Sequence, residues 1–196
     1  MRWILVAAVV GSLVLGVSAA FATHGTAPTV DAIDGSGAGT FNGNINNTTS
    51  DSADWYTFYG IAGTPVTITM ASGAFDTVLT LYQAPGVPAA GDARASYTQI
   101  AFNDDFSGSS NSQIDAVLPA SGYYVVAAES FSSPEDTLGD YTLTITGDVF
   151  ASQEAGLEAC KQGGWENMTD VSGTSFKNQG DCVSYFDTGG ANPANG

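Results

Sequence analysis

Apolar and polar residues alternate with a period of two through the middle of the chain, from about residue 39 to residue 147. Val66, Ile68 and Met70 fall on one side of this alternation, and Thr67 and Thr69 fall on the other. Because successive side chains of a strand point to opposite faces of its sheet, the pattern predicts strands with one buried face. Similar short runs, separated by Gly, Ser, Asn, Asp and Pro, lie at 40–45, 55–59, 76–83, 97–103, 112–118, 122–128 and 141–146.

These runs predict an all-β fold of about eight strands, with no convincing helix between them. Parallel neighbours would need crossover connections of roughly a dozen residues or more, so the short connections favour antiparallel pairing. An antiparallel two-sheet sandwich of the jelly-roll kind buries one face of every strand. We expect this sandwich to occupy residues 39–148.

The alternation ends near residue 148, and helical signals follow. Ser152 is placed to cap a short helix through Ala159, and Gly163 is placed to end it. A second short helix is expected to carry Cys182 and Phe186. We therefore predict a small helical module over residues 149–188, followed by a Gly-, Asn- and Pro-rich end, 189–196, that is disordered.

The beginning of the chain predicts export. A short positive start is followed by an apolar run over 4–17 and by the small residues of Ala20-Phe21-Ala22. This order is typical of a secretory signal peptide, 1–22, with cleavage before Thr23. The run is shorter than the roughly 20 residues that a membrane-spanning helix needs. Residues 23–38, which are rich in Gly, Ala, Pro and Asp, are expected to form a flexible lead-in.

The charge of the chain is strongly negative, with 20 acidic residues against four basic ones and a net charge of −16. If Arg2 leaves with the signal, the basic residues that stay are Arg94, Lys161 and Lys177. An acidic surface repels nucleic acids and anionic membrane surfaces, which excludes the first and disfavours the second as partners. The charge favours solubility, bound divalent cations or a basic partner.

Cys160 and Cys182 are the only cysteines. In an exported chain an even pair predicts a disulfide, and two thiols alone make a poor metal site. The bond would stabilise the C-terminal module by about 3 kcal/mol in the chain-entropy description.

Five segments resemble, in the same order, those of the bacterial pre-peptidase C-terminal domain family. They are DWYTF at 54–58, FDTVLTLY at 75–82, NDD at 103–105 followed by SQI at 112–114, SGYYVV at 121–126 and GDYTL at 139–143. The resemblance implies a compact β-sandwich without catalytic activity, usually attached to secreted peptidases or other exported enzymes. It also implies binding of calcium or of extracellular polymers such as collagen in some members. This chain carries no peptidase segment upstream of the resemblance.

The C-terminal segment resembles a second, shorter type of bacterial module. CKQGGW at 160–165 and FKNQGDCVSY at 176–185 are similar to a short module at the C-termini of small secreted bacterial proteins. The resemblance implies localisation and a disulfide, and no activity.

The best candidate for chemistry is an acidic loop that begins at Asn103. Asp104 and Asp105 lie in it, Asn111 follows closely, and Asp76 begins a strand that could lie beside it. Calcium takes six to eight hard oxygen ligands, which carboxylates, amides and backbone carbonyls on a Gly-containing turn supply. Asp and Asn also form ordinary turns, so a structural role is the alternative. We predict a calcium site at Asp76, Asp104, Asp105 and Asn111.

Catalytic groups are scarce. His24 is the only histidine and lies next to the predicted cleavage point, which leaves no base for a nucleophilic triad and no His-rich zinc site. The alternation in residues 55–59 places Trp55 and Tyr59 on one face and Tyr56 and Phe58 on the other. One set must enter the core, which makes an aromatic platform for sugars or peptides the weaker interpretation.

The sequence therefore predicts an exported, non-catalytic domain that binds an extracellular protein or polysaccharide and is stabilised by calcium. Two alternatives stay open: a structural component of the cell envelope, and a small hydrolase that uses a pair of carboxylates.

Overall fold

The computed structural model describes residues 30, 32–45, 53–131 and 139–195 of the 196-residue chain. The predicted signal peptide, its cleavage site and His24 lie outside the described residues. The strands are β1 (Gly35–Ser36), β2 (Gly39–Ile45), β3 (Ala53–Gly60), β4 (Pro65–Ser72), β5 (Thr77–Gln83), β6 (Thr98–Asn103), β7 (Ser112–Val117), β8 (Gly122–Ser130) and β9 (Gly139–Thr146). All eight predicted strands are present.

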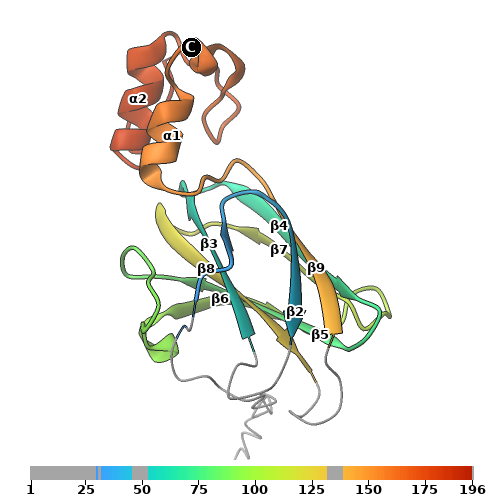
Figure 1. Ribbon diagram of the computed structural model, residues 1–196. Coiled ribbons are helices and arrows are strands. Elements are labelled where there is room, and N and C mark those ends of the chain that lie inside the picture. The colour runs from blue at the N-terminus through green and yellow to red at the C-terminus, as the bar shows by residue number, and fades with distance from the viewer. Residues whose placement is uncertain (1–29, 31, 46–52, 132–138, 196) are drawn as a thin grey trace, which may run out of the picture.

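The strands form two sheets that face each other (Figure 1). The five-stranded sheet has the order β1-β3-β8-β5-β6, and the four-stranded sheet has the order β2-β9-β4-β7. Every pairing is antiparallel except that of β1 with β3. The predicted all-β, antiparallel sandwich is confirmed.

The strand β1 differs from the sequence prediction, which makes all of residues 23–38 a flexible lead-in. Gly35 and Ser36 pair in parallel with β3, and the Asp34 and Gly37 amides donate to backbone carbonyls of the same strand. These contacts use backbone groups only. Side-chain alternation therefore gives no signal for them.

The main core fills the space between the two sheets. Tyr56 and Phe58 of β3 point into it, and the Phe58 ring stacks on that of Tyr124, with the ring centroids 5.3 Å apart. Ile68 and Met70 of β4 enter from the opposite sheet and are fully buried. The alternation seen in the sequence thus places the apolar side of each strand inside.

The other face of β3 is also buried. Trp55 packs with Val30, Tyr82 and Tyr97 on the outer side of the five-stranded sheet, and Tyr59 packs under the C-terminal module. All four aromatic residues of the 55–59 run are buried, so β3 offers no exposed aromatic platform.

The C-terminal module sits at one end of the sandwich (Figure 1). It contains α1 (Gln153–Ala159), the 3-10 helix η2 (Gly164–Asn167) and α2 (Gln179–Asp187). Ser152 caps α1 through a bond from the Ala155 amide to its hydroxyl, as predicted. Cys160 and Cys182 form the expected disulfide, with an S–S distance of 2.03 Å. No described helix is both long and apolar enough to span a membrane.

The end of the chain contacts the C-terminal module, although the sequence predicts a disordered segment 189–196. The Ala194 amide donates to the Asp170 carboxylate, and Asn195 donates to Asp181 from its backbone and its side chain. Residues 189–195 thus bond to the module, and the disorder of the whole segment 189–196 stays a prediction. The composition of this segment indicates flexibility, but composition carries no information on which side chains of the module accept hydrogen bonds from its backbone amides.

Candidate functional site

The outer side of the four-stranded sheet is a broad polar surface, which we call the Thr/Asn face. Alternation along each strand turns most apolar side chains inward and leaves mainly polar ones outside. Its outward residues are Thr40, Asn42 and Asn44 on β2; Asp140, Thr142, Thr144 and Thr146 on β9; Thr67, Thr69 and Ala71 on β4; and Gln113, Asp115 and Val117 on β7. All of them are exposed or half-buried.

Hydrogen bonds between neighbouring strands hold these side chains in place. The hydroxyls of Thr40 and Thr144 lie 3.3 Å apart, and the Thr67 hydroxyl donates to the Asp115 carboxylate at 2.6 Å. The Gln113 amide donates to the other Asp115 oxygen at 2.7 Å. The bonds from Thr67 and Gln113 lower the pKa of Asp115, which is therefore a carboxylate at neutral pH. The face is an ordered array rather than a set of loose side chains.

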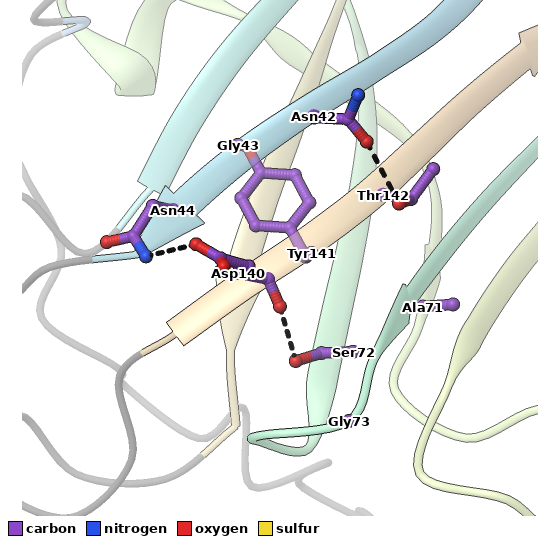
Figure 2. Close-up of a pocket in the computed structure, with 9 residues that line it drawn as sticks. All are labelled: Asn42, Gly43, Asn44, Ala71, Ser72, Gly73, Asp140, Tyr141 and Thr142. Carbon is purple, nitrogen blue, oxygen red and sulfur yellow. Dashed lines mark hydrogen bonds between the residues drawn. The ribbon is translucent and has the colours of Figure 1, made fainter.

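An open depression of about 610 Å³ lies at one end of the Thr/Asn face. Figure 2 shows its polar groups converging from three strands. The Asn44 amide donates to the Asp140 carboxylate at 2.6 Å, and the Thr142 hydroxyl donates to the Asn42 carbonyl at 3.2 Å. The Ser72 hydroxyl donates to the Asp140 backbone carbonyl at 2.8 Å. The depression therefore presents amide, hydroxyl and carboxylate groups to a ligand.

A buried tyrosine supports this depression from inside the sandwich. The Tyr141 ring reaches across to Gly43, where a Cβ atom would lie only 2.2 Å from the ring (Figure 2). The Tyr141 hydroxyl donates to the Asp54 carboxylate at 2.5 Å and accepts from Tyr56 at 2.7 Å. Burial, followed by these bonds, raises the pKa of Tyr141, and burial raises that of Tyr56 to about 12. The network joins the two sheets below the depression.

Part of the outer side of the five-stranded sheet is covered, in contrast to the open Thr/Asn face. A segment after β5 places Arg94, the first residue of the 3-10 helix η1 (Arg94–Ser96), over Trp55 and Tyr82. The guanidinium donates to both oxygens of Glu129, at 2.6 and 2.9 Å, and to the Tyr82 hydroxyl at 2.8 Å. Burial alone would lower the pKa of Arg94, but the Glu129 carboxylate and the Tyr82 hydroxyl together outweigh it and raise that pKa. This cluster closes that part of the sheet rather than forming a site.

The predicted calcium loop forms a tight turn between β6 and β7. The Asn103 side chain donates to the Asp105 carbonyl and accepts from the Gln113 amide. The Phe106 amide donates to the Asn111 carbonyl at 2.7 Å. Asp105 is exposed and Asp104 is half-buried.

The loop lies beside the start of β5, as the prediction requires. The Ser112 hydroxyl donates to the carbonyls of both Thr77 and Asp104, and the Thr77 amide donates to Ser110. Because Asp76 directly precedes Thr77, the backbones of all four predicted ligand residues meet at this end of the sandwich.

Bringing the backbones together does not assemble a metal centre of charged ligands. Among the described residues, no three His, Cys, Asp or Glu side chains form a group that could hold a metal ion. The Asn111 side-chain oxygen already accepts from the Ser72 amide at 3.1 Å. Calcium binding at Asp76, Asp104, Asp105 and Asn111 stays a prediction.

Sequence reasoning did not identify the Thr/Asn face as a site. The signal was present, because Thr67 and Thr69 occupy the polar positions of one strand and Thr142, Thr144 and Thr146 those of another. Alternation does not reveal which strands pair or in what register. The face becomes visible only when β4 and β9 lie side by side.

Comparisons with known proteins give distant similarities. No model of a known protein family matches the chain, and no curated protein matches its sequence. A solved pre-peptidase C-terminal domain of a collagenase from Bacillus anthracis is similar at 14% identity and a TM-score of 0.44, over 59% of this chain and 96% of that chain. The resemblance of the C-terminal module to that of small secreted bacterial proteins stays a prediction.

Two other solved structures are similar to a comparable degree. PliG from Aeromonas hydrophila, a periplasmic inhibitor of g-type lysozyme, has 20% identity and a TM-score of 0.40, over 59% of this chain and 99% of that chain. CorA, a surface-associated copper-binding protein of Methylomicrobium album BG8, has 12% identity and a TM-score of 0.45, over 59% and 98%. These similarities are too distant to assign a ligand or a residue role to this chain.

Proposed function

We propose that this chain is an exported, non-catalytic domain that binds an extracellular protein or polysaccharide through its Thr/Asn face. The observation that carries the proposal is the open, hydrogen-bonded array on the four-stranded sheet, with a depression at one end. Part of the outer side of the other sheet, around Trp55 and Tyr82, and one end of the sandwich are occupied by the chain itself. The Thr/Asn face is a broad ordered surface that the described part of the chain does not cover.

Two further features support this function. The Cys160–Cys182 disulfide suits an oxidising compartment, which agrees with the predicted signal peptide. The carboxylates of the face are held by neutral donors, Asp115 by Thr67 and Asp140 by Asn44. Such bonded carboxylates serve as fixed acceptors for a ligand, which favours binding over acid–base chemistry.

Co-sedimentation with insoluble polymers tests the proposal. The purified chain is mixed with cellulose, chitin or fibrous collagen, and the bound fraction is measured after centrifugation. Thr144→Arg places a long side chain in the middle of the Thr/Asn face, and Gly73→Trp adds a large ring at the depression, where a Cβ atom would meet no atom within 4 Å. Thr98→Arg, on an exposed position of β6 in the other sheet, is the matched control.

We expect the wild type and Thr98→Arg to bind at least one polymer, and Thr144→Arg and Gly73→Trp to lose that binding. Circular dichroism of each variant establishes that its fold is intact. Binding that persists in both face variants would contradict the proposed site, as would the absence of binding to every polymer.

A further inference from the structure

The described side chains of the Thr/Asn face include no basic one, in a chain with a net charge of −16. Of the 20 acidic residues, Asp115 and Asp140 are the two among its outward side chains, and Lys and Arg are missing from that set. Both carboxylates are engaged by neighbouring side chains. These side chains therefore offer no positive charge to an anionic polymer, and the charge of the whole chain repels one.

The chemistry of the face is that of hydroxyl and amide groups. A threonine hydroxyl both donates and accepts, and an Asn or Gln amide does the same through two atoms. Sugar hydroxyls have the same dual capacity, and threonine methyl groups can pack against the C–H groups of a sugar ring. Protein interfaces instead depend mainly on Trp, Tyr and Arg anchors, and the described outward side chains of this face include none.

The spacing of the array suits a ligand that repeats. Thr40, Thr144, Thr69 and Gln113 lie directly opposite one another on four successive strands. With neighbouring strands about 4.8 Å apart, this row extends for about 14 Å. Parallel rows follow at steps of about 6.8 Å along the strands, and one of them leads into the depression. An extended chain of sugars can meet several rows at once.

Building on the proposed function, we infer that the polymer is a neutral polysaccharide. Its chain lies along the Thr/Asn face, where threonine hydroxyls and Asn and Gln amides bond to its hydroxyl groups. One sugar unit occupies the depression, where the Asp140 carboxylate and the Asn44 amide bind its hydroxyls. Each contact is weak and the array multiplies it, so the protein prefers polymers to free monosaccharides.

Affinity electrophoresis in native gels tests this inference with the purified chain. The gels contain a neutral polymer (dextran, β-glucan or mannan), an anionic one (alginate) or a protein polymer (gelatin). The double variant Thr69→Val with Thr144→Val keeps the β-branched shape of both residues and removes their hydroxyls. Thr98→Val on β6 is its control, and Thr144→Arg reports whether the face is used at all.

We expect retardation by a neutral polysaccharide, none by alginate, and binding about tenfold weaker in the double valine variant, with Thr98→Val unchanged. Retardation by gelatin alone that Thr144→Arg abolishes would overturn the inference while the proposed function stands. Neutral-polymer binding that Thr144→Arg abolishes but the valine pair leaves unchanged would do the same. Retardation that no variant alters would overturn both.

Discussion

Arg94 offers the sharpest test of the packing. Of the ion pairs in the described part of the chain, its pair with Glu129 is the one that includes a buried carboxylate. The Glu129 side chain is 5% exposed and that of Arg94 is 19% exposed. At an effective dielectric constant of about 20, a pair about 4 Å apart attracts by about 4 kcal/mol. Replacing the arginine by methionine keeps the stem that lies against the rings but leaves the carboxylate buried without this partner.

Breaking one side of a buried pair costs about 3–5 kcal/mol, and the partial exposure of Arg94 places the expected loss at about 3 kcal/mol. For a chain of this size that loss lowers the melting temperature by roughly 10 °C. Thermal and urea unfolding, followed by circular dichroism, measure both quantities for Arg94→Met. Lys161→Met is the matched control, because its ion pair with Glu158 is exposed and should leave the melting temperature unchanged.

The double variant Arg94→Met with Glu129→Leu separates the two sources of the loss. An apolar pair in this position removes the stranded charge, and we expect it to recover most of the stability. If Arg94→Met is no less stable than Lys161→Met, or if the double variant is as unstable as the single one, the reasoning about the buried charge is refuted.

Four further outcomes are expected. Gly43→Ala places a methyl group against the Tyr141 ring and should cost about 1–3 kcal/mol in urea unfolding, whereas Gly73→Ala, with open space around it, should be neutral. Replacing Cys160 and Cys182 by serine should make the C-terminal module sensitive to limited proteolysis and leave the sandwich intact; equal cleavage of both would argue against separate stabilisation. Burial raises the pKa of Tyr141 above its ordinary value of about 10, so the stability that its protonated phenol contributes is complete below that pH and is lost as pH rises through the folded pKa. Unfolding at pH 8 and pH 11 should show a larger loss in the wild type than in Tyr141→Phe. If calcium binds, excess calcium should raise the melting temperature relative to chelator; identical melting curves would reject the site.

The strands could be predicted well from the sequence because the alternation of apolar and polar residues within each strand marks its inward and outward positions. The alternation of Val66, Ile68 and Met70 with Thr67 and Thr69 along β4 is such a local signal. The N-terminal cap at Ser152 follows from the local sequence, and the disulfide follows because the chain has two cysteines, whereas the C-cap of α1 is Cys160 rather than the predicted Gly163. Antiparallel order and the eight main strands follow from these signals and from short connections.

Contacts between distant segments were beyond the reach of the same reasoning. Arg94 and Glu129 are 35 residues apart, and nothing in either neighbourhood indicates that they meet. The second buried face of β3 depends on segments that pack over Trp55 and Tyr59 from elsewhere in the chain. The Thr/Asn face likewise needs the register of β2, β9, β4 and β7, which alternation leaves undetermined.

The pairing of β2 with β9 also sets the order in which the protein can fold. Thr40 and Thr144 are 104 residues apart, and β2 has no other strand partner among the described strands. β4 likewise needs β9 to join it to β2. Closing such a long loop is entropically costly, so folding is expected to be slow for a chain of this length. While residues 139–146 have not yet emerged during synthesis or export, the four-stranded sheet lacks β9, the strand that joins β2 to β4. The molecule then stays open until nearly all of its sandwich has emerged.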